Sequence, residues 1–216
     1  MKLKSYLLAA ALLGLATSPV LGASLPKTGL AGTKHDIGAV GCKGCHAPHS
    51  GALANGGAES TGLILLWSRS FPAAANTFGV YDSATMKNKA TDLGGTALTT
   101  STDNRMYSLL CLSCHDGVTS TFSPAMLSVN KVGSKASFGT GAYESLGLTN
   151  DHPINMSYNP INNPALQPVA TVTASLPLYG STNTIQCGTC HDSHNNVNTR
   201  FLRQVNNTAH CTTCHI

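Results

Sequence analysis

Apolar residues are spread unevenly along the 216-residue chain, and the longest apolar run comes first. Residues 6–16 form this run, which follows the basic start Met1–Lys4 and precedes the small residues Gly22 and Ala23. The run is shorter than the roughly 20 residues that span a bilayer, which disfavours an uncleaved membrane anchor. Basic, apolar and small residues in this order are typical of a secretory signal. We predict a signal over residues 1–22, with cleavage after Gly22 or Ala23.

Beyond that segment, the pattern predicts little regular structure. Neither a long series of helical period nor a set of alternating strands is present. A short helix is expected over 103–114, with Thr102 or Asp103 as N-cap, and a short strand over 169–174. Stretches rich in Gly, Ser, Thr, Ala and Asn predict loops at 55–61, 91–103 and 133–142. Residues 23–216 are therefore expected to form one mostly irregular domain with a few short helices and minimal strand.

The composition leaves this domain short of side chains for a core. Only 6% of residues are aromatic, and 10% are charged, against roughly 25% in an average protein. So low a charged fraction argues against a coiled coil and against a nucleic-acid binder with a basic stripe. Without Lys2 and Lys4 of the signal, the 13 basic residues become 11 against 9 acidic ones, so the net charge falls from +4 to +2. We expect something other than side chains to fill the interior.

All eight cysteines lie in four Cys-x-x-Cys pairs, and a histidine directly follows each pair. This pentapeptide is the attachment site of a c-type haem, in which two thiols form thioethers and the histidine becomes the proximal iron ligand. The predicted attachment residues are Cys42, Cys45, Cys111, Cys114, Cys187, Cys190, Cys211 and Cys214. The predicted proximal ligands are His46, His115, His191 and His215.

Zinc and disulfides are the two competing explanations of the cysteine pairs. A zinc ribbon needs two pairs that converge on one metal, and it has no use for a histidine after every pair. Disulfides are common in exported chains and explain the cysteine spacing, but they do not explain the histidines. Four repeats that use every cysteine favour four haem c groups, each with an iron.

Five further histidines are candidates for the second axial position of these irons. They are His35, His49, His152, His194 and His210. The alternative ligands are Met86, Met106, Met126 and Met156. No methionine has a setting that marks it as a ligand, and core methionines are usually packing residues. We therefore predict bis-histidine ligation by His35, His49, His152 and His194, and leave His210 unassigned.

Chain length restricts which histidine can serve which iron. Two histidines on one haem iron have Cα atoms about 12 Å apart, whereas three residues reach at most about 11 Å. His49 therefore cannot ligate the iron held by His46, and His194 cannot ligate the iron held by His191. Each must serve a different haem, in the same chain or another. His35, in contrast, can reach the distal side of the first haem.

His152 lies in the sequence Asp151-His152-Pro153. Pro153 disfavours a helical backbone at His152, which predicts a ligand carried by a loop. Asp151 could orient the imidazole by hydrogen bonding, or it could be a solvated turn residue.

Four haems would alter both the core and the charge of the domain. Each porphyrin supplies apolar surface, so we expect the irregular chain to wrap around a stacked chain of four c-type haems. Two propionates per haem add about −8, which brings the +2 of the chain to about −6. Two axial imidazoles leave no coordination site for a substrate, which predicts electron transfer between neighbouring rings and no enzymatic activity.

Several segments resemble multihaem c-type cytochromes of metal-reducing bacteria. These segments are residues 42–51, 65–68, 110–117, 151–155, 187–194 and 201–203. The chain is most similar to the OmcE-type tetrahaem cytochromes, which polymerise into extracellular conductive filaments. The resemblance implies an extracellular location, identical subunits and redox proteins or extracellular acceptors as partners, and ligation by His49 of a haem in the adjoining subunit.

Three functions compete at this point. The first is the subunit of an extracellular cytochrome filament, or nanowire. The second is a monomeric periplasmic electron shuttle, in which His49 ligates an iron of its own chain or His210 takes that position. The third is a multihaem reductase with one open iron. Five spare histidines for four positions, and the lack of a Cys-x-x-Cys-Lys motif, speak against the reductase.

Overall fold

The computed structural model describes residues 30–37, 41–46, 67–68, 71–72, 78–94, 98, 103–116, 148–149 and 151–216. Several sequence-based predictions lie outside these residues: the signal over 1–22, the loops at 55–61 and 133–142, and the candidate ligands His49 and Met126. Within the described residues, no helix has both the length and the apolar character needed to cross a membrane.

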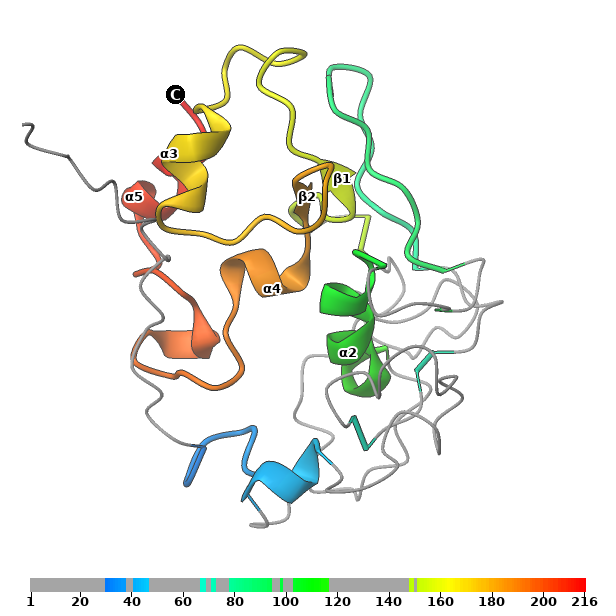
Figure 1. Ribbon diagram of the computed structural model, residues 1–216, viewed down its shortest axis with the longest axis vertical. Helices are drawn as coiled ribbons and strands as arrows, with labels where there is room; N and C mark the ends of the chain where they lie inside the picture. The colour runs from blue at the N-terminus through cyan, green and yellow to red at the C-terminus, as the bar shows by residue number, and fades with distance from the viewer. Residues whose placement is uncertain are drawn as a thin grey trace, which may run out of the picture.

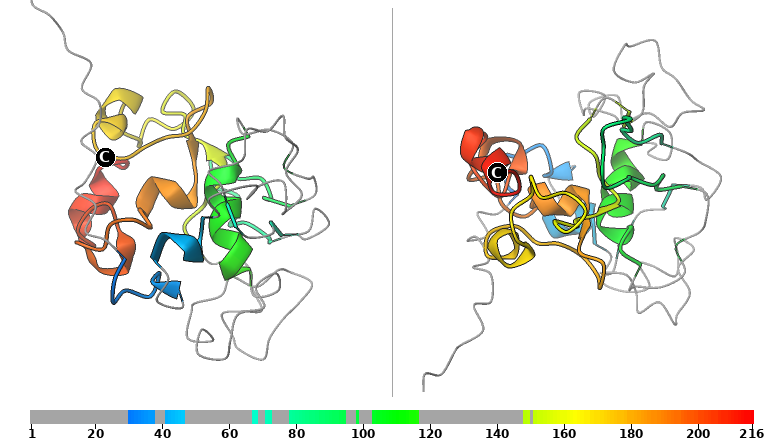
Figure 2. Two further views of the ribbon diagram at one scale, coloured as in Figure 1. Left: turned by 60° about the horizontal axis from the view of Figure 1, so that its bottom comes forward. Right: turned by 90° about the horizontal axis from the view of Figure 1, so that it is seen from above.

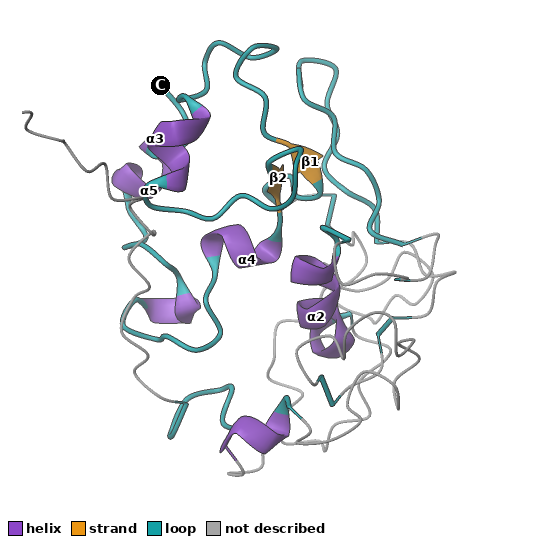
Figure 3. Cartoon of the chain, viewed as in Figure 1, coloured by secondary structure: helices purple, strands orange, loops and turns teal. Residues whose placement is uncertain are grey.

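The described elements are short and are joined by irregular segments (Figures 1 and 3). In chain order they are η2 (Gly41–Gly44), α2 (Met106–His115), β1 (Met156–Ser157), α3 (Val169–Thr173), β2 (Thr184–Ile185), α4 (Cys187–Cys190), η6 (Thr199–Phe201) and α5 (Thr208–Thr212). The two strands pair antiparallel, with Met156 opposite Ile185 and Ser157 opposite Thr184. The part of the chain that the structure describes thus has few helices and little strand.

Helix α2 covers much of the range predicted as helical, but its start differs from the prediction. The residue before the helix is Arg105, and no side chain caps the helix. The carboxylate of Asp103, a predicted N-cap, accepts hydrogen bonds from the Arg105 backbone N–H at 2.9 Å and from its guanidinium at 2.6 Å. The Asp103 side chain therefore fixes the residue that precedes the helix, while the Asp103 backbone carbonyl accepts from the Met106 N–H at 3.0 Å.

The prediction of a strand over residues 169–174 is wrong, because this segment forms α3. Pro168 lies in an extended conformation directly before the helix. The Thr173 hydroxyl donates to the Val169 carbonyl at 3.0 Å, and Val172 is fully buried. The packing of Val172 in the core outweighs the preference of valine and threonine for strands.

Two apolar clusters make up most of the described core. The first packs against α2 and contains Phe78, Leu93, Leu109, Leu112 and Leu148. The second involves both strands and α3 and contains Met156, Tyr158, Leu166, Val172, Leu176 and Ile185.

A buried polar link, formed by Ser108, Gln186 and Asn155, connects α2 to the start of α4. The Gln186 side chain has no exposed surface. It accepts a hydrogen bond from the Ser108 hydroxyl at 2.6 Å and donates one to the Asn155 side chain at 3.0 Å. The Ser108 oxygen also accepts from the Cys187 backbone N–H at 3.0 Å. As a result α4 lies beside α2 in every view, and the second and third cysteine motifs are adjacent (Figures 1 and 2).

Candidate functional site

Each Cys-x-x-Cys-His motif forms a helical turn. The histidine N–H donates to the carbonyl of the first cysteine in the first, third and fourth motifs, at 2.8, 3.0 and 3.0 Å. The second motif lies within α2. Residues three and four apart share one face of a helical turn. Both thiols and the histidine can therefore address the same bound group.

Three pairs of histidine rings lie at nearly the same separation. The ring centres are 6.1 Å apart for His46 and His194, 6.3 Å for His35 and His115, and 6.3 Å for His152 and His215. In each pair, one histidine belongs to a cysteine motif and the other is a spare histidine.

The separation of the paired rings fits two imidazoles that share one metal ion. Two metal–nitrogen bonds of about 2.0 Å, plus about 1.2 Å from each nitrogen to its ring centre, give ring centres about 6.4 Å apart. A zinc site would instead need three or four converging ligands. Among the described residues, no three His, Cys, Asp or Glu side chains converge in this way. Two imidazoles at the observed separation fit haem iron, for which the porphyrin would supply the other ligands.

The pairs assign partners that chain length alone left open. His194 lies against His46 and not against its neighbour His191, as the reach argument requires. His35, which the sequence placed within reach of the first haem, lies against His115 of the second motif. Distance along the sequence was therefore a poor guide to the partner of His35.

His191 is the motif histidine that has no ring partner within the described part of the chain. Its imidazole is exposed, and its Nδ1 donates to the Arg200 carbonyl at 2.9 Å. His210 lies close enough for His191 to lower its pKa, although burial lowers that pKa more. No ring contact joins His210 to His191 among the described residues, and His49 lies outside them.

Oxygen atoms orient several of the imidazoles through Nδ1. Besides the Arg200 carbonyl at His191, the Pro153 carbonyl lies 3.0 Å from Nδ1 of His152, and an Asp192 carboxylate oxygen lies 3.5 Å from Nδ1 of His194. A partner at Nδ1 leaves Nε2 free for a metal. For His152 this partner is Pro153; the exposed Asp151 agrees with the second interpretation, a solvated turn residue.

Burial favours the neutral, metal-binding form of two spare histidines. It is the main cause that lowers the pKa of His35 and of His152. The motif histidines add to the shift, since His115 lowers the pKa of His35 and His215 lowers that of His152.

The thiols of three motifs lie close to one another. The Cys111 and Cys187 thiols share a hydrogen bond, which raises the pKa of Cys111 well above its usual value and lowers that of Cys187. Burial, and then the proximity of Cys214, raise the pKa of Cys190 to about 11. The second motif therefore adjoins the third, and the third adjoins the fourth.

Aromatic residues that sequence reasoning did not single out also contact the motifs. The Trp67 ring meets the edge of His46 with ring centres 5.7 Å apart, and its Nε1–H donates to the Ser113 hydroxyl at 3.0 Å. Tyr107 and Tyr179 stack with ring centres 3.7 Å apart beside the second and third motifs. Trp67 lies in the segment 65–68 that carries part of the resemblance, but no local pattern reveals the contacts of these three rings, because their partners come from distant segments.

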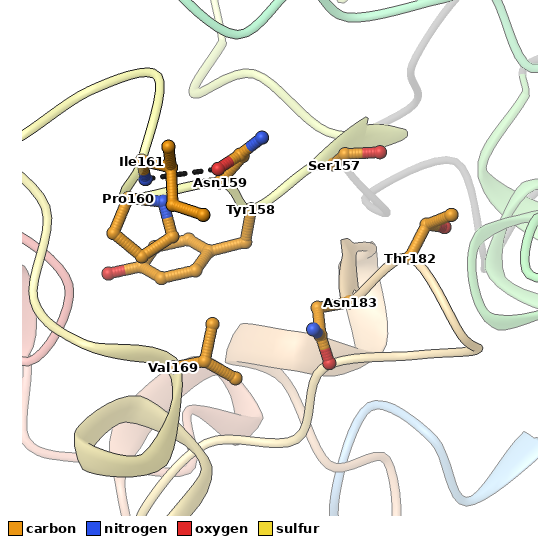
Figure 4. Close-up of a pocket in the computed structure, with 8 residues that line it drawn as sticks. All are labelled: Ser157, Tyr158, Asn159, Pro160, Ile161, Val169, Thr182 and Asn183. Carbon is orange, nitrogen blue, oxygen red and sulfur yellow. Dashed lines mark hydrogen bonds between the residues drawn. The ribbon is translucent and has the colours of Figure 1, made fainter.

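A cavity of about 380 Å³ lies away from the paired histidines. Its lining consists of Ser157, Tyr158, Asn159, Pro160, Ile161, Val169, Thr182 and Asn183 (Figure 4). None of these is a predicted ligand or attachment residue. The Tyr158 hydroxyl, however, donates to the Cys214 carbonyl at 2.9 Å, so one wall of the cavity supports the fourth motif.

Comparison with known proteins adds no assignment. No family model matches the chain, and no curated protein matches it significantly. The functional interpretation therefore depends on the cysteine motifs and on the geometry of the histidines.

Proposed function

We propose that this protein transfers electrons through four covalently attached haems, each held by two axial histidines. The observation that carries the proposal is the set of three histidine pairs, each of which joins one motif histidine to one spare histidine at 6.1–6.3 Å. The sequence alone distinguishes the motif histidines from the spare histidines. The pairing of one kind with the other in the structure therefore supports the proposal independently of the sequence motifs.

Cysteine side chains would attach the haems, and oxygen atoms near the imidazoles would orient the histidine ligands. When bound, a haem held by two imidazoles would supply one-electron transfer and would leave no open position for a substrate. The motif cysteines would provide two thiols for each attachment, and each S–H would add across one vinyl group. The oxygen partners at Nδ1 hold the imidazoles of His152, His191 and His194 in fixed directions. Fixed ligands reduce the reorganisation that accompanies a change of charge at the metal.

Contacts between motifs favour a continuous path for electrons. Trp67 connects the first motif to the second, and Cys111 contacts Cys187 of the third. Cys190 of the third motif lies close to Cys214 of the fourth. Residues 190–194 serve two sites at once, because His191 belongs to the third motif and His194 pairs with the first.

Mass spectrometry and optical spectroscopy of the natively matured protein test haem binding. We expect an increase of about 616 Da at each of the four motifs and low-spin spectra in both oxidation states. A mature chain without these increments would refute the proposal. Binding of carbon monoxide to the reduced protein would instead reveal an open iron and favour the reductase.

We further propose that the protein is a subunit of an extracellular filament, with His49 of one copy as the second ligand at His191 of the next. The exposed ring of His191, unpaired within the described residues, supports this arrangement. Electron microscopy of the native protein is expected to show fibres with a regular repeat. His49→Ala should abolish the fibres and create one high-spin haem while leaving haem attachment intact.

One observation favours the monomeric shuttle as a second candidate. Burial lowers the pKa of His210, and His191 is near enough to lower it further, so a small movement would make His210 the second ligand of the iron at His191. In that case His210→Ala, and not His49→Ala, would generate the high-spin haem. The native protein would then appear as separate particles.

A further inference from the structure

The turn formed by Arg200 and Phe201 has an unusual backbone. Both residues have positive φ angles, 62° and 58°, in the left-handed region that residues other than glycine rarely adopt. Such a conformation persists only where the surroundings impose it, and it is found preferentially at functional positions. Here the Phe201 carbonyl accepts from the Asp192 N–H at 2.8 Å, and the Phe201 N–H donates to the Asn196 side chain at 3.3 Å.

This turn contacts the imidazoles of two different haem sites. The Arg200 carbonyl accepts the hydrogen bond from Nδ1 of His191, in the third motif. The Phe201 ring stacks on His35, which pairs with His115 of the second motif. The centres of these two rings are 4.1 Å apart and their planes differ by 28°, while Phe201 is only 8% exposed.

His35 depends on this stacking more than the other paired spare histidines do. His152 and His194 each have an oxygen within 3.5 Å of Nδ1. Nδ1 of His35 is buried and forms no hydrogen bond of good geometry with the described residues, although the Ser193 backbone is near enough to raise its pKa. The flat face of Phe201 is therefore the main restraint on rotation of the His35 ring.

We propose that Phe201 is a positioning residue, which holds the His35 imidazole nearly perpendicular to that of His115 through the left-handed turn that also orients His191. The planes of His35 and His115 differ by 79°. This inference depends on the proposed haem binding. It adds that the second haem owes its ligand geometry to an aromatic ring and that the second and third haems share one structural support.

Electron paramagnetic resonance of the oxidised protein is sensitive to the angle between the two imidazole planes at each iron. Nearly perpendicular imidazole planes give a low-spin ferric haem a strongly anisotropic signal, whereas nearly parallel planes give a rhombic one. The test variant is Phe201→Met, which keeps apolar volume but removes the flat face. Phe201→Tyr keeps the face, and Phe78→Leu, at a fully buried ring that packs elsewhere, controls for a general loss of packing.

We expect Phe201→Met to lose one haem equivalent of the anisotropic signal, with a matching gain in rhombic or broadened signal. Phe201→Tyr and Phe78→Leu should retain it. An unchanged signal in Phe201→Met, with four low-spin haems present, would overturn the role of Phe201 and leave the proposed function intact. If Phe201→Met does not accumulate, Phe201→Leu replaces it, and an anisotropic signal retained by Phe201→Leu overturns the proposal. A parent protein that shows only rhombic signals also overturns the proposal. Absence of haem from the parent protein would refute the proposed function itself.

Discussion

Replacement of Gln186 by leucine should destabilise the protein without changing its haem content. The side chain is fully buried and joins Ser108 on α2 to Asn155 through bonds of 2.6 and 3.0 Å. Leucine has a similar size but leaves the Ser108 hydroxyl donor and the Asn155 carbonyl oxygen without these partners. Each unsatisfied buried group costs about 1–3 kcal/mol.

The expected loss in the free energy of unfolding is about 3 kcal/mol, because added apolar burial offsets part of the cost. For a domain of this size, that loss lowers the melting temperature by about 6–12 °C. Guanidinium or thermal unfolding, followed by circular dichroism in the haem absorption band, measures the change. Covalent haem should remain at all four motifs, because the thioethers do not depend on this link.

A matched control and a double-mutant cycle make the result specific. Gln167→Leu changes a half-buried side chain with one weak bond, of 3.5 Å to the Thr212 carbonyl, and should cost less than about 0.5 kcal/mol. The double variant with Ser108→Ala should cost less than the sum of the single variants, because the two residues share a bond. Equal stability of Gln186→Leu and the parent protein would refute the idea that this polar link holds the second and third motifs together.

Four other results are expected. The parent protein should show two strongly anisotropic signals and one rhombic signal from its three histidine pairs, whose planes differ by 79°, 70° and 17°; three similar signals would contradict these orientations. His194→Ala should convert the haem at His46 to a high-spin, carbon monoxide-binding form, as seen in the optical spectrum. Gly188→Ala should lower stability and displace the tyrosine stack, because a Cβ at this position would lie 2.6 Å from the Tyr179 hydroxyl; an unchanged melting temperature argues against the contact. Burial raises the pKa of Tyr179 to about 12. Since this tyrosine ionises at a lower pH once unfolded, stability should be complete below pH 10 and fall between about pH 10 and 12. Tyr179→Phe should reduce this fall in unfolding experiments across that range.

The cysteine motifs and the spare histidines are visible in the sequence, but the pairing of the histidine rings is not. The pentapeptides predict the attachment residues because the thiols and the histidine are neighbours in the chain. Distance along the chain also excluded a pairing of His194 with His191. It could not select His115 for His35, because that pairing joins two segments that are distant in the sequence.

Short-range sequence patterns predicted some secondary-structure elements correctly and others wrongly. The apolar spacing that predicted a helix after Asp103 corresponds to α2. The β-branched residues from Val169 onward suggested a strand, yet buried Val172 packs as part of a helix. The left-handed turn at Arg200 and Phe201 contains neither glycine nor asparagine, so the sequence does not predict it. Its hydrogen bonds with His191, Asp192 and Asn196 hold the conformation, and the Phe201 ring stacks on His35 from a distant segment.

The long sequence separation within each histidine pair sets the order in which both rings of a pair become available during synthesis. A ribosome releases the chain from its N-terminus, so His35 and His115 are the first pair to become available together. His46 emerges early but stays without its partner until His194 has been made. Interrupted translation before residue 194 would therefore leave the second site as the only one of the three described pairs with both imidazoles.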